Sequence, residues 1–371
     1  MTKNEMIRLT KPVIPESAIA LAVEVLRSGN LVQGKYVSAL EAKLAEYLGV
    51  RECVCVTSGT AALHLAVLAL DLPRASEAVV PGFTFPATAN AAEQAGIRTI
   101  LADISRTSCC IDPKEIEKAI SPATRLLIPV HEFGQAADMD PIMEIAEKHR
   151  LAVIEDAACA LGTEYHGKKC GTIGDIGCFS FHPRKAITTG EGGAIVTNDP
   201  QIAAKLRTLR NHGIRISDGK NDFVCAGLNY RMTDFQAALA LEQLAGFEEQ
   251  IRHRRKVAAL YAEALKEISW ITVPSEFPNR RMVYQTYHVL LDGAVDRTAL
   301  IAFLRERGIE SNYGAQALSR LSYYRSHVVS GLTYGESEYA YAHGLALPMG
   351  SHVTEDEITK IASTLKLFQK K

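Results

Sequence analysis

The sequence predicts an α/β protein, in which a large domain with a mostly parallel central sheet is followed by a smaller α+β domain. Short apolar runs alternate with amphipathic stretches between residues 53 and 200, which is typical of strands joined by helices. After residue 230 this pattern gives way to a long helical stretch and then to short mixed elements. The 371 residues, 47% of them hydrophobic, are enough for two cores of unequal size. We therefore expect a large domain over 1–245 and a small one over 246–371, which begins with a connecting helix.

Two amphipathic helices are expected at the start of the chain. Residues 16–27 place Ile19, Val23 and Leu26 on one helical face, and residues 38–48 repeat the pattern with three leucines four residues apart. A glycine follows each segment, as is common just beyond the C-terminal end of a helix.

The middle of the chain supplies the strands of the sheet. Strands are expected over 78–80, 99–102, 125–130 and 151–155, and a helix over 140–149. A hairpin with a basic tip is expected over 162–169. In the small domain, residues 284–291 predict a strand and 296–307 a helix. The loops that carry functional residues all follow strands, as in open parallel sheets.

The segment FSFHPRKAITTGEGGAIVTND, residues 179–199, places Lys185 between a short apolar run and a glycine-rich turn. Burial and cationic neighbours, here Arg184 and His182, are expected to lower the pKa of this lysine and to free its amine for a Schiff base with a carbonyl. Taken alone, Lys185 is more typical of a solvated loop. Three other segments change this interpretation, because they supply the remaining parts of a pyridoxal phosphate site.

The first of these segments is a phosphate-binding turn. Ser58, Gly59 and Thr60 follow a strand and begin an apolar helix, where unpaired N–H groups and the helix dipole favour an anion. The alternative is an ordinary helix N-cap that binds no ligand.

The second and third segments would hold the cofactor ring. An apolar strand ends in Glu155 and Asp156, and a carboxylate at this position can keep a pyridine nitrogen protonated. We assign this role to Asp156, because strand alternation turns Glu155 to the opposite side; the alternative is a helix N-cap aspartate. Phe83 and Phe85 follow another strand, where either ring could stack on a heterocycle or belong to the core.

These segments resemble the DegT/StrS group of pyridoxal phosphate-dependent sugar aminotransferases, which have the aspartate aminotransferase-like fold (fold type I). The similarity extends nearly from end to end and is most specific over residues 154–199. The other matching segments include TSGTAALHLA at 57–66, PVHEFGQAADMD at 129–140 and GLNYRMTDFQAALALEQL at 227–244.

The resemblance implies that Lys185 forms the Schiff base with the cofactor, that Asp156 partners the pyridine nitrogen and that Phe85 stacks on the ring. Family members that remove a hydroxyl instead of transferring an amine carry a histidine at the lysine position, so Lys185 favours amino transfer. The positions that hold the phosphate in this family correspond here to Gly59, Thr60, Ser180 and Asn229. The asparagine acts from the neighbouring subunit, which implies a homodimer with shared active sites.

The chain departs from the family pattern at two places in the pocket. Cys159 stands where the family usually has His, Gln or Glu, which removes a polar contact near the cofactor ring. Residues 308–316 lack the His and Pro that usually follow the glycine-isoleucine of the small domain. We therefore expect the substrate side of the site to be unusual.

The expected reaction moves an amino group from L-glutamate to a nucleotide-linked 3-keto or 4-keto deoxysugar. The resemblance leaves two alternatives open: a cyclic polyol ketone as acceptor, or a non-catalytic regulatory role, which the intact site residues disfavour. Candidate substrate contacts are Asn30 and Tyr313, and also Arg231, which could bind a diphosphate or anchor an interface. A cysteine desulfurase would need a reactive thiol, for which Cys170 is the only candidate.

Composition excludes several other classes of protein. The formal net charge of -1 argues against nucleic acid or an anionic membrane as the main partner. No apolar run approaches the roughly 20 residues that span a bilayer, and the first eight residues lack the apolar core of a secretory signal. The eight cysteines match neither a disulfide framework nor a zinc site, so we expect free thiols, no metal and a cytoplasmic enzyme.

Overall fold

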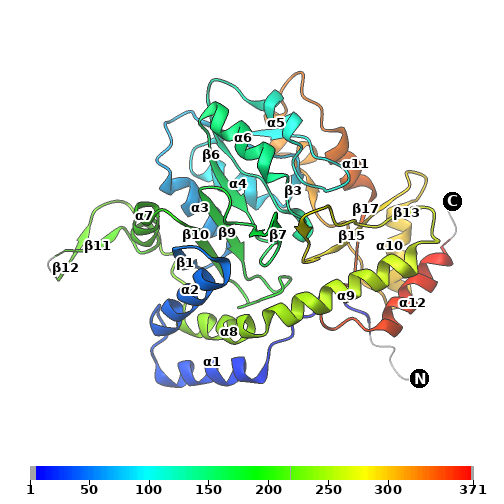
Figure 1. Cartoon of the computed structure of the whole chain (residues 1–371), viewed down its shortest axis with the longest axis horizontal. Coiled ribbons are helices and arrows are strands. Elements are labelled where there is room, and N and C mark those ends of the chain that lie inside the picture. Colours follow the sequence, from blue (N-terminus) through cyan, green and yellow to red (C-terminus); the bar gives the residue numbers. More distant parts are fainter. Residues whose placement is uncertain (1–5, 218, 369–371) are drawn as a thin grey trace.

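A seven-stranded, mostly parallel sheet forms the centre of the molecule, as the sequence predicts (Figure 1). The structure is a computed structural model that describes residues 6–217 and 219–368. Only β10 is antiparallel to its neighbours. In spatial order the strands are β1 (Glu52–Val56), β10 (Gly193–Thr197), β9 (Ile176–Ser180), β6 (Ala152–Asp156), β5 (Thr124–Leu127), β2 (Glu77–Pro81) and β4 (Arg98–Ala102).

Helices cover both faces of this sheet and join its strands. Those of the first 245 residues are α1 (Glu16–Ser28), α2 (Lys35–Leu48), α3 (Gly59–Ala69), α4 (Ala87–Gln94), α5 (Pro113–Ala119), α6 (Met139–His149), α7 (Pro200–Arg210) and α8 (Asp234–Ala245). The long helical stretch expected after residue 230 forms two helices. The first, α8, ends before Gly246, and the second is α9 (Phe247–Leu265).

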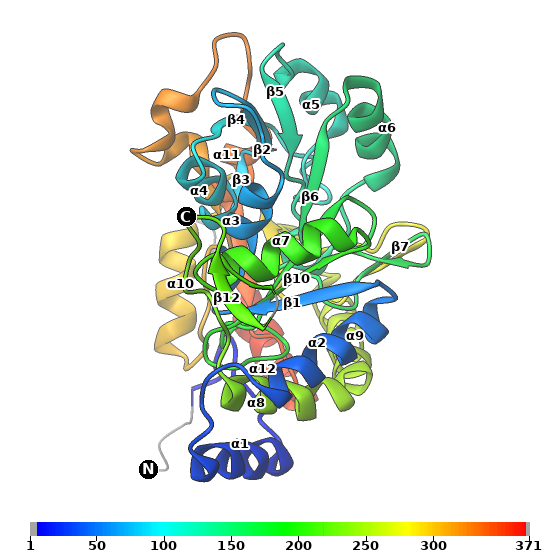
Figure 2. The same ribbon diagram turned by 90° about the vertical axis from the view of Figure 1, so that its left-hand side faces the viewer.

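The first helix packs on α8 at the edge of the molecule (Figures 1 and 2). Its small side chains Ala18 and Ala22 are buried there, whereas Ile19, Val23 and Leu26 are exposed. The predicted apolar face of this helix therefore exists but points outward. The reason is that close packing against α8 uses the alanine face and leaves the larger residues exposed.

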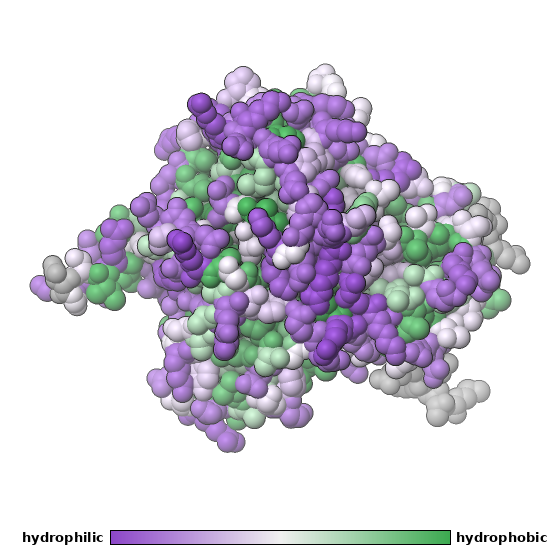
Figure 3. All heavy atoms as spheres, in the orientation of Figure 1, coloured by the Kyte–Doolittle hydropathy of each residue, from purple (hydrophilic) through white to green (hydrophobic). Residues whose placement is uncertain are grey.

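Two hairpins extend from the large unit. The predicted basic hairpin is confirmed as β7 (Glu164–Tyr165) and β8 (Lys168–Lys169), whose tip is exposed. A second hairpin, β11 (Ile214–Ser217) and β12 (Lys220–Phe223), projects from the body (Figure 3). It carries Ile216 and Phe223, which are exposed.

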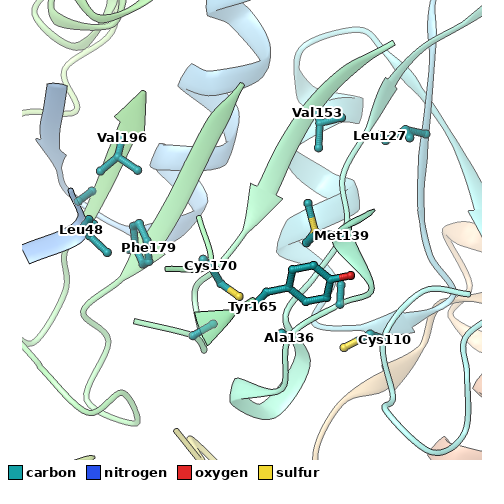
Figure 4. Close-up of a cluster of buried hydrophobic side chains, with 14 of the residues drawn as sticks. Leu48, Cys110, Leu127, Ala136, Met139, Val153, Tyr165, Cys170, Phe179 and Val196 are labelled. Carbon is teal, nitrogen blue, oxygen red and sulfur yellow. The ribbon is translucent and has the colours of Figure 1, made fainter. Parts of the chain in front are cut away.

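Alternate side chains of each strand enter two different cores. Cys53, Val153 and Phe179 face the side covered by α2, α6 and α8 (Figure 4). Val54 and Ile154 face the opposite side, where α3, α4 and α7 pack. Because both faces of the sheet are covered, the strands read as near-continuous apolar runs.

The C-terminal residues form a separate hydrophobic cluster around a small antiparallel sheet. Its strands are β13 (Ile271–Thr272), β15 (Tyr287–Leu291) and β17 (Gly344–Leu347), and they pack with α9, α10 (Arg297–Glu306) and α12 (Glu355–Lys366). Ile7 belongs to this cluster and bridges to Ile309. The remaining elements are β3 (Phe83–Thr84), β14 (Arg280–Arg281), β16 (Gln316–Ala317), α11 (Gly335–His343) and three single turns of 3-10 helix, η1 (Glu132–Gly134), η2 (Leu318–Arg320) and η3 (Tyr324–His327).

No helix in the described part of the chain is long and apolar enough to cross a lipid bilayer. The expectation about a secretory signal concerns residues that lie mostly outside the described range.

A buried aspartate from α8 starts the second helix. Asp234 Oδ1 accepts backbone N–H groups from Gly34, Tyr36 and Val37 at 2.9, 3.1 and 2.9 Å. A side chain on Gly34 would collide with this carboxylate, since a Cβ would lie 2.8 Å from Asp234 Oδ2. This cap explains why α2 begins three residues before the expected start, since the capping group comes from 200 residues further along the chain.

We predict that Asp234→Ala lowers the free energy of unfolding by about 2–4 kcal/mol, because the three backbone amides that donate to the buried carboxylate would lose their hydrogen-bond acceptor. Urea unfolding followed by circular dichroism measures the change. Asp222→Ala is the matched control, since Asp222 is exposed on the projecting hairpin. A loss no larger than that of the control would contradict the capping role.

Candidate active site

A cavity of about 400 Å³ lies where the strands of the sheet end. Most of the predicted cofactor residues line it: Ser58, Gly59, Thr60, Phe85, Asp156, Ser180 and Lys185. The C-terminal part of the chain closes one side with Asn312, Gly314 and Ala346. A larger open groove of about 840 Å³ runs along the 164–167 hairpin and residues 276–281, but it contains none of the predicted site residues.

Lys185 lies in a loop after β9, with Nζ 2.9 Å from Cys159 Sγ. The sequence-based expectation of a lowered pKa is wrong. Burial does pull the pKa of Lys185 down, but interaction with Cys159 and the carboxylates Asp156 and Glu132 outweighs it, and the pKa is raised. The predicted cationic neighbours, Arg184 and His182, therefore do not decide the direction of this shift.

Asp156 ends β6 and is almost completely buried. Its Oδ2 accepts from Thr88 Oγ1 at 2.7 Å and its Oδ1 from the backbone N–H of Ala158 at 3.1 Å. No helix follows it in the described chain before β7, so the alternative of a helix N-cap does not apply. The hydrogen bonds hold a carboxylate at the cavity wall, where it can pair with a protonated ring nitrogen.

Glu155 points to the opposite side, as strand alternation predicts, and its carboxylate is fully buried. It accepts backbone N–H groups from Gly171, Ile173 and Gly174 at 2.6–2.7 Å. His131 Nε2 lies 2.8 Å from the same carboxylate. Since His131 Nδ1 accepts the N–H of Ala137, the ring proton is on Nε2 and is donated to Glu155.

The N-terminal turn of α3 forms a cradle for an anion. Ser58 Oγ accepts the N–H of Ala61, which leaves the amides of Gly59 and Thr60 in the first turn, at the cavity wall. Gly59 is required at this point, because a Cβ would lie 2.8 Å from Ser180 Cβ. Amides, hydroxyls and the helix dipole make a donor set that fits a phosphate.

The two candidate aromatic rings have different surroundings. Phe83 is buried and packs edge to face on Phe133 at 6.0 Å, so it belongs to the core. Phe85 lines the cavity with 63% of its surface exposed, and its ring is free to stack. Together with the phosphate cradle and Asp156, this ring gives the cavity the groups that pyridoxal phosphate needs.

Four predicted residues do not reach this cavity in their own chain. Asn229 is exposed, Arg231 donates to Asn211 Oδ1 at 2.6 Å, and Asn30 lines a separate cavity beside Asp234. Tyr313 packs edge to face on Tyr341 beside the cavity rather than in it.

The cysteine desulfurase alternative requires a reactive thiol, and Cys170 does not provide one. This thiol is completely buried, and burial raises its pKa well above the usual value, so it supplies no reactive thiolate.

Sequence reasoning missed two ionisable groups of the cavity, the exposed Glu191 and the buried Glu132. Glu132 follows His131 in the segment PVHEFGQAADMD and is buried against the site. Burial first, and Asp156 second, raise the pKa of this carboxyl to about 7. A charged residue two positions after the expected strand over 125–130 was the available signal, but the direction of its side chain depends on the turn conformation.

Comparison with known proteins agrees with this geometry. The model of the DegT/DnrJ/EryC1/StrS aminotransferase family matches residues 12–366. GDP-perosamine synthase of Caulobacter vibrioides is 37% identical over 335 residues, which cover 90% of each chain. Among solved structures, Spr1654 of Streptococcus pneumoniae in its PMP form has a TM-score of 0.93 at 27% identity and 97% coverage of both chains. Helicobacter pylori PseC, an aminotransferase of pseudoaminic acid biosynthesis, has a TM-score of 0.93 at 26% identity and 98% coverage of both.

We predict that Gly59→Ala weakens pyridoxal phosphate binding at least about tenfold, which corresponds to about 1.4 kcal/mol of binding free energy. The added methyl group would displace either Ser180 or the first turn of α3. Titration of the visible cofactor absorption measures the dissociation constant. Gly246→Ala is the control, since a Cβ at Gly246 meets nothing within 4 Å. Equal affinities in the two variants would show that the turn does not hold the phosphate.

Proposed function

The chain belongs to the DegT/DnrJ/EryC1/StrS aminotransferase family, and we propose that it transfers an amino group from L-glutamate to a nucleotide-linked keto-deoxysugar. It is a pyridoxal phosphate-dependent aminotransferase of amino sugar biosynthesis. The observation that carries the proposal is the convergence of Lys185, Asp156 and the first turn of α3 on one cavity. Similarity to a GDP-perosamine synthase supports the nucleotide-linked acceptor.

In the proposed site, Gly59, Thr60 and Ser180 hold the cofactor phosphate. Asp156 pairs with the ring nitrogen, and Phe85 stacks on one face of the ring. Bound pyridoxal phosphate supplies an aldehyde that accepts an amine and a protonated ring that withdraws electrons. Two hydrogen bonds orient the carboxyl group of Asp156 at the cavity wall, where such a ring would lie.

Lys185 is the proposed general base and acid. Its Nζ takes a proton from the α-carbon of the amino donor in the first half of the reaction. In the second half it delivers a proton to the former keto carbon of the sugar. The amine must be unprotonated at the first step, which the raised pKa of Lys185 opposes. A nearby group that accepts the proton therefore matters to this mechanism.

We further propose that the active sites are shared within a homodimer. The exposed apolar residues of the chain include Ile19, Val23 and Leu26 on α1 and Ile216 and Phe223 on the projecting hairpin. Such surfaces are typical of subunit interfaces. Asn229, Arg231 and Asn30 lie outside the cavity of their own chain, so their proposed contacts with phosphate or substrate require a second copy.

We place the reaction in the cytoplasm. The cysteines are free in the structure, including Cys53 and Cys55 on one face of β1 and the adjacent pair Cys109 and Cys110. Unpaired thiols at such short separations are typical of proteins from a reducing compartment.

The purified protein with pyridoxal phosphate is expected to show a visible absorption band that L-glutamate bleaches. Lys185→Ala should keep its fold but fail to regenerate the band from the amine form of the cofactor when a keto acid is added. Absence of the band in the parent protein would overturn the catalytic assignment. A band that glutamate leaves unchanged would point to another amino donor.

Mixing two inactive variants tests the shared site. Lys185→Ala and Asn229→Ala should each lose activity, and subunit exchange between them should restore it, because one site of each mixed dimer has both residues. Lys185→Ala mixed with Asp156→Ala is the control and should stay inactive, since both residues line the cavity of the same chain. No recovery in the first mixture, with exchange verified by mass spectrometry, would contradict the assignment of Asn229.

A further inference from the structure

The backbone around Lys185 belongs to neither a helix nor a strand. Residues 181–192 connect β9 to β10 without regular secondary structure. A lysine side chain is long and flexible, so the position of its ammonium depends on the direction in which the side chain leaves the backbone. The proposed reaction needs Nζ of Lys185 in the active-site cavity. Side chains from other parts of the chain supply the restraint that the local backbone lacks.

Gln285 reaches this segment from the C-terminal part of the chain. It lies two residues before β15, is 6% exposed and lines the active-site cavity. Its Oε1 accepts the backbone N–H of Ala186 at 3.1 Å, and its Nε2 donates to Arg184 O. The two partners settle the orientation of the amide, because an N–H group only donates and a carbonyl oxygen only accepts. One side chain thus binds the backbone on both sides of Lys185.

These two hydrogen bonds fix the backbone dihedral angles of Lys185. Because a peptide group is planar, the carbonyl of Arg184 belongs to the plane before Lys185 and the N–H of Ala186 to the plane after it. The angles φ and ψ of Lys185 are the rotations of these two planes about its Cα. Since both planes are bound to the same amide, the direction of the Cα–Cβ bond is set. The donation of Lys185 N–H to His182 O at 2.8 Å holds the first plane only.

The backbone of Gln285 is itself anchored to two other elements. The N–H groups of Val283 and Thr286 donate to carbonyls of the turn η1, both at 3.3 Å. Arg254 of α9 is buried and donates from Nη1 to Tyr284 O and Gln285 O at 3.2 and 3.4 Å. The amide of Gln285 therefore extends toward the lysine from a fixed base.

We propose that Gln285 is a positioning residue for Lys185 in this aminotransferase. Its amide binds the backbone and not Nζ, so it acts through the direction in which the lysine enters the cavity. No proton moves and no covalent bond changes at Gln285 itself. A misplacement of a reacting group by about 1 Å can slow a reaction about 100-fold. This inference rests on the proposed role of Lys185.

The test compares the parent protein with Gln285→Met, Gln285→Asn and Gln135→Met. Methionine has the length of glutamine without its donor and acceptor, and asparagine keeps the amide but is one methylene shorter. Gln135 is the control, because it is similarly buried and donates to Ser275 O at 3.0 Å. It lines a neighbouring cavity of about 200 Å³ and not the active-site cavity.

Hydrogen exchange of the protein without added cofactor measures the contact with Ala186 directly. In the parent, the Ala186 amide should exchange much more slowly than in an unstructured peptide, because its N–H donates to a buried acceptor. Both Gln285 variants should exchange at this amide at least about tenfold faster, and Gln135→Met at the parent rate. The parent measurement does not require any variant to fold.

Two forms of the cofactor separate an effect on Lys185 from an effect on the whole cavity. Pyridoxal phosphate joins Lys185, whereas its amine form uses the phosphate and ring contacts alone. In the Gln285 variants the visible band should form roughly 10- to 100-fold more slowly, and the affinity for the amine form should change by less than about twofold. The saturating rate constant of the glutamate half-reaction should fall by a similar factor, with little change in the glutamate concentration that gives half of it.

An Ala186 amide that exchanges in the parent as in an unstructured peptide would overturn the inference. So would parent rates of band formation and glutamate reaction in the Gln285 variants, since Lys185 would then not depend on this contact. Equal losses of affinity for both cofactor forms would also contradict it, because Gln285 would then support the cavity as a whole. A parent protein that binds neither cofactor form would instead refute the proposed function, and its exchange data would still show whether Gln285 holds the backbone of Lys185.

Discussion

The carboxylate of Glu155 is the interaction on which the geometry of the site depends. Buried behind β6, it receives hydrogen bonds from three backbone amides of the segment before β9 and from His131 in the turn after β5. It thereby fixes the strand that ends in Ser180 and the turn that carries Glu132. Asp156, the next residue, faces the cavity because successive strand residues alternate. One pair of adjacent carboxylates therefore supplies both the support and the cofactor-binding group.

The electrostatic character of the cavity follows from this arrangement. Asp156, Glu132 and Glu191 bring acidic groups to the wall, and Arg184 and Lys185 come from the loop after β9. Interaction with Cys159, Asp156 and Glu132 outweighs burial and raises the pKa of Lys185. The lysine is therefore favoured as an ammonium, contrary to the usual picture of a base activated by burial alone. Cys159, whose Sγ lies 2.9 Å from Nζ, belongs to the same cluster, and burial raises the pKa of its thiol.

Exposed apolar residues on two elements support the proposed shared site. Ile19, Val23 and Leu26 of α1 and Ile216 and Phe223 of the β11–β12 hairpin are exposed. Asn229 and Arg231 occupy the segment between that hairpin and α8, away from the cavity of their own chain. A second copy would cover the apolar residues and complete the phosphate and substrate contacts together.

The sequence by itself determined the fold class, the order of the strands along the chain and the identity of the cavity residues Lys185, Asp156 and the Ser58–Thr60 turn. These depend on local patterns: an apolar period, a strand followed by a carboxylate, and small polar residues at a helix start. The resemblance to the DegT/StrS family depends on the same local segments of the sequence. Even the opposite directions of Glu155 and Asp156 follow from the period of a strand, which is a property of the backbone alone.

Only the tertiary structure decided the features that depend on contacts between distant segments. The start of α2 is set by Asp234, and the outward apolar face of α1 follows from alanine packing on α8. The charge of Lys185 and the burial of Glu132 arise from groups that lie next to one another only in the folded chain. The physical reason is that periodicity specifies which face of an element is apolar, whereas capping, burial and pKa depend on what packs against it.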